Sequence, residues 1–354
     1  MSKAKWSEIA SGPIFFERNR VHRVYKGGKL FAPFFGDESK DGSQPEEWVA
    51  STVKALNRVH GVKNEGLSVV KGETVTLAQL MKEYPSSMLG ERREVGVLVK
   101  ILDSAIRLPV QAHPDSSFSQ AHFNGHHGKT EMWLILDTRE NAKIYYGFKE
   151  GVTREDFLDA VKRSEEDKKA MSALLNELPA QKGDVYLIPA KMVHAIGCGC
   201  LILEVQEPTD YTIQPEAWCG DFLLNDYQKY LGLDQNLAME CFDFSVQGEE
   251  ALKKGRKNPR TLVKTPRLHS EALIDYEDTP CFKVVRHRLW EGELAIPQGP
   301  SVIVVTEGEG YLKKGEEGRP VKKGDYFFMP YEAKGWTAQG GAFLELVECL
   351  PPKE

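Results

Sequence analysis

An internal repeat constrains the fold of this chain more than any other feature of its sequence. The stretch LPAQKGDVYLIPAKMVHAIGCGCLILEV at residues 178–205 resembles RPVKKGDYFFMPYEAKGWTAQGGAFLEL at residues 319–346. Six positions keep one register, so chance similarity of two hairpins is disfavoured and the same strand–turn–strand unit is expected twice. A constant offset of 141 residues aligns Gly183 with Gly324, Asp184 with Asp325, Pro189 with Pro330, Gly199 with Gly340, Leu203 with Leu344 and Glu204 with Glu345.

The repeated pattern predicts the fold class. Gly-Asp, then four residues, a proline and a strand is typical of small antiparallel jelly-roll barrels of the cupin type. We therefore expect an all-β protein of two cupin-type barrels with helical insertions. The expected domains are an N-terminal catalytic domain over residues 1–219, a helical linker over residues 220–265 and a degenerate barrel over residues 266–354.

Three stretches carry helical rather than strand signals. Residues 153–178 have apolar side chains near helical spacing, and Thr153 with Asp156 forms a capping-box pattern at their start. A second helical region is expected at about residues 220–256. A short helix is expected in TLAQLMKEY, where Pro85 should end it.

Composition limits the possible partners and compartment. With 354 residues, 41% of them apolar, the chain can bury a sizeable core, and its net charge of −6 disfavours nucleic acid as a partner. The start MSKAKWSEIA has no apolar signal region, and no run approaches a membrane span, so no membrane partner is expected. The six cysteines are sparse, and Cys198 and Cys200 are expected to be small buried residues in a reducing, cytoplasmic compartment. The oligomeric state is left open.

The repeat also points to one functional site rather than two. The offset of 141 places His194 opposite Gly335. An imidazole in one copy and no side chain in the other favours a site in the first copy and a degenerate second copy.

Two pairs of polar residues lie two apart in predicted strands. Gln111 and His113 occur in LPVQAHPDSS, and Lys129 and Glu131 occur in GKTEMW. Residues i and i+2 of a strand share a face, so each pair points to one side. If both strands line the mouth of one barrel, Gln111, His113 and Glu131 can converge with His194. Two imidazoles, a carboxylate and an amide oxygen suit a divalent ion of zinc type, with a position left open for water or substrate.

These segments resemble a known family. LVKILDSAIRLPVQAHPDSSF, GKTEMWLIL, IPAKMVHAIG and LEVQEPTD occur in the same order in the class I mannose-6-phosphate isomerases, and HRVYKGGKLF and PEEWVAST resemble that family's opening segments. The resemblance implies a zinc enzyme of cupin fold that interconverts mannose-6-phosphate and fructose-6-phosphate. It assigns one metal ion to Gln111, His113, Glu131 and His194, and active-site roles to Lys129 and Asp210. Such a reaction moves a proton between adjacent carbons through an enediol, which needs an acid or base and a positive centre for the oxyanion.

One position departs from the family. After Asp210, the family pattern ends in an arginine, and Gln214 stands there in EPTDYTIQPEAW. Glutamine lacks the fixed charge and forked donors of arginine, so another cation takes over or the substrate differs. The alternatives are an isomerase of a related or unphosphorylated sugar and a non-catalytic, metal-binding, sugar-sensing cupin. The sequence offers as replacement cations Arg18, Arg20, Arg23, Arg286 and Arg288.

A further group of histidines is expected to be unrelated to this site. They lie in the turn-rich stretch AHFNGHHGK, which predicts an exposed loop at the rim. The three histidines concerned are His122, His126 and His127.

Overall fold

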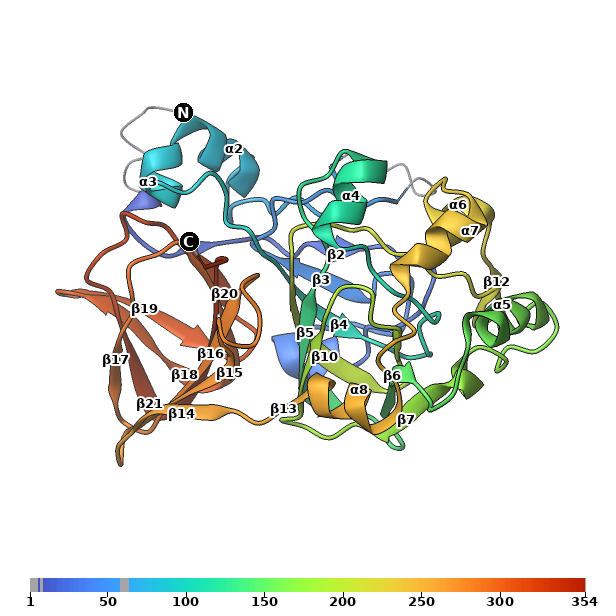
Figure 1. Ribbon diagram of the computed structural model, residues 1–354. Helices are drawn as coiled ribbons and strands as arrows, with labels where there is room; N and C mark the ends of the chain where they lie inside the picture. The colour runs from blue at the N-terminus through green and yellow to red at the C-terminus, as the bar shows by residue number, and fades with distance from the viewer. Residues whose placement is uncertain (1–5, 7–8, 58–63, 354) are drawn as a thin grey trace.

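The computed structural model describes residue 6, residues 9–57 and residues 64–353, which form a β-rich protein with helices at its periphery (Figure 1). Two large antiparallel sheets dominate it, one from each half of the chain. Residues 1–5 and 7–8, on which much of the signal-peptide expectation depends, lie outside the described residues.

The N-terminal sheet has the strand order β13-β8-β5-β10-β4-β3-β2, and a three-stranded sheet, β7-β6-β9, supplies further strands from the same half. The bounds are β2 Arg20–Val21, β3 Glu46–Val49, β4 Leu98–Asp103, β5 Glu131–Thr138, β6 Lys143–Phe148, β7 Leu175–Pro179, β8 Val185–Ile188, β9 His194–Ile196, β10 Cys200–Gln206 and β13 Arg256–Lys257.

The C-terminal sheet has the order β1-β20-β18-β21-β16-β15-β14, with β17 on β21 and β19 on β18. A separate hairpin joins β11 Trp218–Cys219 to β12 Phe222–Leu223. The remaining bounds are β1 Ile14–Phe15, β14 Arg260–Lys264, β15 Leu268–Ile274, β16 Lys283–Leu289, β17 Glu293–Ala295, β18 Ser301–Lys314, β19 Glu317–Lys322, β20 Tyr326–Met329 and β21 Thr337–Leu350.

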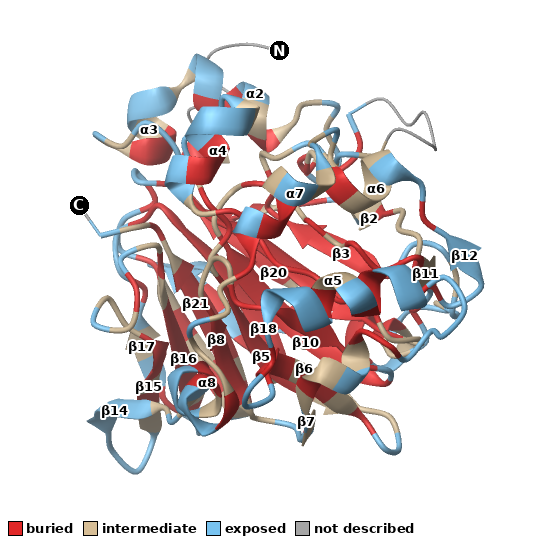
Figure 2. Ribbon diagram, turned by 45° about the vertical axis from the view of Figure 1, so that its right-hand side comes forward, coloured by how far each residue is buried: buried red, intermediate tan, exposed pale blue. Residues whose placement is uncertain are grey.

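The helices are short and lie around the sheets with their outward faces exposed, whereas most strands are buried, with β12 and β14 as exposed exceptions (Figure 2). Their bounds are α2 Leu77–Glu83, α3 Pro85–Leu89, α4 Ser116–Phe123, α5 Arg154–Arg163, α6 Asp226–Tyr230, α7 Gln235–Ala238 and α8 Gly248–Gly255, with single turns at η1 Ala32–Gly36, η2 Ser172–Leu174 and η3 Met239–Cys241.

The helical predictions are confirmed in part. Thr153 caps α5 and forms the expected capping box with Asp156. The helical signal over 153–178 is wrong at its end, because residues 175–179 pair with β6 as strand β7, and this sheet pairing overrides the local spacing. Pro85 follows the end of α2 as expected, but it also begins α3, since proline fits the first turn of a helix.

The main core lies between the two large sheets. Alternate residues of β4 and β10, such as Val99, Ile101 and Leu203, face Val304 and Val347 of the C-terminal sheet across one hydrophobic cluster. Because side chains alternate along a strand, the residues between them face the other way, and these include charged ones. The N-terminal sheet therefore has one apolar face toward its partner sheet, and on its other face charged side chains border a cavity beside a second apolar cluster.

The two copies of the repeat share one turn. Gly183 and Gly324 have positive φ values of +94° and +87°. Asp184 accepts a hydrogen bond from the amide of Gln181 at 3.0 Å, and Asp325 accepts the same bond from Lys322 at 2.9 Å. The strands that follow, β8 and β20, cover residues 185–188 and 326–329, which keeps the predicted offset of 141.

Beyond this turn the predicted register is wrong. Trp133 pairs with Tyr186 and Glu204, whereas Ile303, which occupies the same place, pairs with Phe327 and Glu348. The counterpart of Glu204 is therefore Glu348, three residues beyond Glu345. The C-terminal copy has a longer connection, and a shift of three residues puts every later side chain on the opposite face from the one predicted. The alignments of Gly199 with Gly340 and Leu203 with Leu344 fail with it.

The counterpart of His194 also changes. Its backbone exchanges two hydrogen bonds with Gln111, at 3.0 and 2.9 Å. In the same place of the C-terminal copy, the Ile296 amide donates to the carbonyl of Trp336 at 3.0 Å. Trp336, not Gly335, therefore takes the place of His194, and a bulky apolar side chain replaces the imidazole.

The cysteines depart from expectation at one position. All six are free, and Cys198 is exposed while its neighbour Cys200 is buried. Cys198 lies in the turn before β10, where its thiol donates to the carbonyl of Ala105. Within the described ranges, no helix is long and apolar enough to cross a membrane.

Candidate active site

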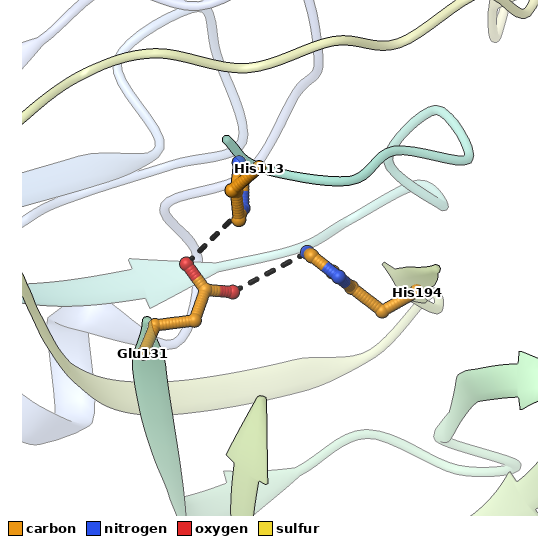
Figure 3. A group of neighbouring side chains, drawn as sticks. All are labelled: His113, Glu131 and His194. Carbon is orange, nitrogen blue, oxygen red and sulfur yellow. Dashed lines mark ion pairs between the residues drawn. The ribbon is translucent and has the colours of Figure 1, made fainter. Parts of the chain in front are cut away.

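Three predicted ligands converge at the polar face of the N-terminal sheet. His113 precedes α4, Glu131 begins β5 and His194 begins β9 (Figure 3). The Nε2 atom of His113 lies 3.3 Å from Glu131 Oε2, and the Nε2 atom of His194 lies 3.3 Å from Glu131 Oε1. The three side chains are buried, and their candidate ligand atoms all lie within 4.8 Å of one another.

The hydrogen bonds of the two imidazoles leave the nitrogens that face Glu131 free to act as ligands. His113 Nδ1 donates to the carbonyl of Tyr211 at 3.0 Å, and His194 Nδ1 donates to the carbonyl of Met192 at 2.8 Å. Burial, and for His113 also the charge of Lys129, lowers the pKa of His113 to about 3 and lowers the pKa of His194. Both rings are therefore neutral, with Nε2 as the unprotonated atom.

This donor set fits a divalent metal ion. His194 Nε2 and Glu131 Oε2 are buried atoms without a hydrogen-bond partner, which is costly unless something else binds them. Carbonyl groups that fix the remote nitrogen of a ligating imidazole are the usual outer partners of a metal site. Gln111 is buried, pairs with His194 through its backbone and lines the same cavity as His113 and Glu131.

Lys129 lies beside these donors, as its spacing from Glu131 predicts. Its Nζ atom is 3.2 Å from His113 Nε2, 3.6 Å from Glu131 Oε2 and 3.4 Å from Thr212 Oγ1. Burial lowers the pKa of Lys129, which brings the amine closer to the range where it can exchange a proton. The ammonium group can therefore reach an atom held at the three donors.

Asp210 also lines the cavity, but its carboxylate is fully engaged. Both of its oxygens accept from the guanidinium of Arg23, at 2.8 and 3.1 Å, and one accepts from the amide of Leu56 at 2.8 Å. Burial opposes ionisation, yet the charges of Arg23 and Lys100 hold the pKa of Asp210 below its ordinary value. Asp210 thus joins two distant segments of the cavity wall.

Gln214 lines the cavity as well, and its amide is committed to the backbone. Its Nε2 donates to the carbonyl of Gln228 at 3.0 Å, and its own N–H donates to the carbonyl of Lys229 at 3.0 Å. These bonds hold α6 against the cavity. Of the five arginines considered as replacement cations, Arg23 alone is among the cavity-lining residues. Arg18 and Arg20 pack on Phe35, and Arg286 and Arg288 pair with Glu271.

A charged network beside the donors was not predicted. Lys100 Nζ lies 3.2 Å from Glu204 Oε1, and Arg23 Nε donates to Glu46 Oε1 at 2.9 Å. Burial, followed by the nearby charge of Glu131, raises the pKa of Glu204. The signal was present in the sequence, since Lys100 and Glu204 interrupt the apolar runs LVKILD and LILEVQ. A charged side chain inside a buried strand needs a partner of opposite charge, and Lys100 and Glu204 are each other's partners.

His113 and Glu131 line a cavity of about 730 Å³, and His194 contacts Glu131 from a fully buried position beside it. The wall of the cavity includes β4, the β11–β12 hairpin and α6, and the size is in the range of small-molecule sites. The loop histidines stay outside it. His122 belongs to the last turn of α4, not to a loop as predicted, and His127 pairs with Glu94.

Comparison with known proteins agrees with this geometry. No protein-family model matches the sequence. The mannose-6-phosphate isomerase ManA of Bacillus subtilis is 31% identical over 353 residues, covering 97% of this chain and 99% of the relative. The mannose-6-phosphate isomerase of Streptococcus mutans is 29% identical over 340 residues, covering 95% of this chain and 97% of the relative.

Solved structures share the fold. The mannose 6-phosphate isomerase of Bacillus subtilis superimposes with a TM-score of 0.74 at 25% identity, over 95% of this chain and 99% of that one. A phosphomannose isomerase of Salmonella typhimurium, at 16% identity and a TM-score of 0.71, covers 97% of this chain and supports the fold alone. With a relative above 30% identity over nearly its whole length, and with three of the motif residues clustered together, this chain belongs to the mannose-6-phosphate isomerase family.

Proposed function

We propose that this protein is a metal-dependent aldose–ketose isomerase that interconverts mannose-6-phosphate and fructose-6-phosphate through an enediol. The observation that carries the proposal is the convergence of His113, Glu131 and His194 with Lys129 at the edge of one cavity. The names of the relatives favour this substrate pair over other sugars.

The proposed metal is one Zn²⁺ per chain. His113, Glu131 and His194 would hold it, and Gln111 is the proposed fourth ligand. Two imidazoles and a carboxylate suit zinc, and three or four protein ligands leave a position for substrate. When bound, the ion supplies positive charge for the oxygen that becomes anionic in the enediol.

The chain's own residues supply the proton chemistry in this proposal. Lys129, within 3.4 Å of Thr212 Oγ1, is placed to hold or move a proton at the carbons next to the substrate oxygens. Asp210 acts with Arg23 to fix the wall on which the sugar rests. The buried pair of Lys100 and Glu204 adds fixed charges to the cavity wall, which we call the polar floor of the cavity. Few groups therefore need to reorient during the reaction.

The proposed architecture is two cupin-type barrels, and the shared turn of β8 and β20 supports it. We propose an N-terminal catalytic domain, residues 1–219, a helical region, residues 220–265, and a C-terminal degenerate domain, residues 266–354. Because β13 pairs with β8 and β14 pairs with β15, strand pairing favours a last boundary at about residue 259. Six free cysteines support a cytoplasmic location.

An assay of isomerase turnover tests the proposal. The zinc-loaded protein should convert mannose-6-phosphate, and removing the metal with a chelator should abolish the conversion. Lys129→Met should lower kcat at least 100-fold, whereas Lys82→Met, at an exposed lysine of α2, should leave kcat within two-fold. Metal binding without turnover of any sugar would favour the non-catalytic cupin instead.

Gln214 is hydrogen-bonded to the backbone of α6 instead of offering a cation to the cavity, which supports one alternative, a shifted sugar preference. The missing charge is worth on the order of 1–2 kcal/mol, or about ten-fold in rate, because a charge-assisted hydrogen bond exceeds a neutral one by about that much. Gln214→Arg should therefore raise kcat/KM for mannose-6-phosphate relative to free mannose by up to about ten-fold. No change in that ratio would mean that the cation is supplied elsewhere.

A further inference from the structure

The cavity contains few charges that are free to bind an anion. Four cationic side chains and five carboxylates line it among the described residues. Arg23 is bound to Asp210 and Glu46, and Lys100 to Glu204. Lys129 faces Glu131. A dianionic phosphate would have to compete with a carboxylate for any of these three.

Lys26 is the exception. It is exposed, it lines the cavity, and within the described ranges it has no carboxylate inside salt-bridge distance. Its charge acts on Asp221 in the β11–β12 hairpin, whose own carboxylate is bound to Lys168 at 2.9 Å. An exposed cation can approach a phosphate without first losing a partner.

The backbone around Lys26 is firmly placed. The amide of Ala105 donates to the carbonyl of Lys26 at 2.8 Å. A Cβ atom on Gly27 would lie 1.7 Å from the carbonyl oxygen of Asp103, so the chain can pass this close to the end of β4 only because the next residue is glycine. Lys26 is therefore anchored at the far end of β4 from the metal donors.

Strand register gives the distance from the donors to Lys26. Glu131 pairs with Gln206, which pairs with Leu98, the first residue of β4. From Leu98 to the level of Ala105 is roughly 20 Å at the rise of a strand. A lysine side chain spans about 6 Å of this at ordinary bond lengths, which leaves roughly 10–15 Å between its Nζ and the donors.

That gap matches a linear hexose phosphate. Seven bonds join C1 to the phosphorus, and at about 1.5 Å per bond the extended chain spans roughly 9 Å. A bond of about 2 Å from oxygen to a metal ion at the donors adds to this length. A hexose with C1 and C2 at the donors therefore places its phosphate within reach of Lys26, and a free hexose does not extend that far.

We propose that Lys26 binds the phosphate group of the substrate and so sets the preference for a sugar phosphate over a free sugar. This inference rests on the proposed isomerase function, because that function fixes which end of the sugar lies at the donors. Asp221 opposes Lys26, since its negative charge lies at the same mouth of the cavity. The two residues together tune phosphate affinity in opposite directions.

The test compares KM and kcat of the zinc-loaded protein for mannose-6-phosphate and for mannose. Lys26→Gln should raise KM for mannose-6-phosphate about ten-fold, leave kcat within two-fold, and leave kcat/KM for mannose unchanged. Lys26→Glu should have a larger effect, and Asp221→Asn should lower KM two- to three-fold. The matched control is Lys29→Gln, an exposed lysine on the same segment that does not line the cavity.

Two outcomes overturn the inference while leaving the isomerase intact. One is a KM for mannose-6-phosphate that rises no more in Lys26→Gln than in Lys29→Gln. The other is an equal loss of kcat/KM for mannose. If wild type turns over no sugar, the proposed function fails, and calorimetric titration with mannose-6-phosphate still decides the role of Lys26. Equal affinity of wild type and Lys26→Gln in that titration would refute phosphate binding by this residue.

Discussion

In the N-terminal copy of the repeat, Glu131 begins β5 and faces two imidazoles across 3.3 Å. In the C-terminal copy, Ser301 begins β18 at the same register, and its hydroxyl donates to Glu348 at 3.1 Å. Trp336 stands where His194 stands in the first copy. The two copies share a turn and a strand ladder, so the fold does not by itself produce the donor cluster.

The interior of the C-terminal half contains one buried imidazole, that of His287, which a hydroxyl group contacts at one of its two nitrogens. Ser270 Oγ lies 2.8 Å from His287 Nδ1, and His287 Nε2 lies 3.5 Å from Glu348 Oε2. The neighbouring side chains are apolar, among them Ile296 and Leu346. One histidine and one carboxylate are too few ligands for a zinc site. The comparison of the two halves shows that the strand pairing serves packing in both, whereas the metal-donor side chains occur in the N-terminal half alone among the described residues.

The largest expected effect is the contrast between two variants. One removes a metal donor from the N-terminal half, and the other replaces the buried imidazole of the C-terminal half. His194→Ala should lose the proposed metal ion and at least 10³-fold in kcat, because that ion would supply several kcal/mol of charge stabilisation. His287→Gln should keep the metal content of the wild type and kcat within about two-fold. Elemental analysis with steady-state kinetics measures both. Equal metal content in wild type and His194→Ala would show that the site lies elsewhere.

The shared turn offers a second comparison. Gly183→Ala should cost about 1 kcal/mol of unfolding free energy, the strain of a side chain at positive φ. Gly324→Ala should cost about 3 kcal/mol, because its Cβ would also lie 2.5 Å from the carbonyl oxygen of Phe34, whereas nothing lies within 4 Å of a Cβ at Gly183. Urea denaturation of both variants checks the order. A larger loss for Gly183→Ala would contradict the packing of this turn against the N-terminal segment.

The smallest effect concerns the aspartates of the same turns. Asp184→Ala and Asp325→Ala each remove one hydrogen bond to a backbone amide, so each should cost about 1 kcal/mol. Asp184 also pairs with the exposed Arg256 at 3.1 Å, which adds at most a few tenths of a kcal/mol. Thermal unfolding should give nearly equal shifts for the two variants. A difference above 1 kcal/mol would mean that the turns are not equivalent.

Local sequence patterns predicted the parts of this molecule that depend on local geometry. The alternation of an extended chain placed Gln111 with His113 and Lys129 with Glu131 at one cavity, although of these four only Glu131 lies in a strand, so the predicted strands were wrong. The Gly-Asp turn was found in both copies. The pairing of Arg23 with Asp210 spans 187 residues and depends on how the sheet folds, so no spacing could reveal it. The shift of three residues in the second copy was hidden, because leucine and glutamate recur at Leu344 and Glu345 by coincidence and imitate the wrong register.

The hydrophobic cluster between the two sheets explains why a copy without donors persists. Val99, Leu134 and Leu203 lie on the back of the strands that carry the polar floor, and they are covered by Val304 and Val347 of the other copy. Without residues 266–354, that back would be exposed to water, and the sheet that positions Glu131 would lose its support. The C-terminal half can therefore lack the donor set, provided that it shields the apolar back of the N-terminal sheet from solvent.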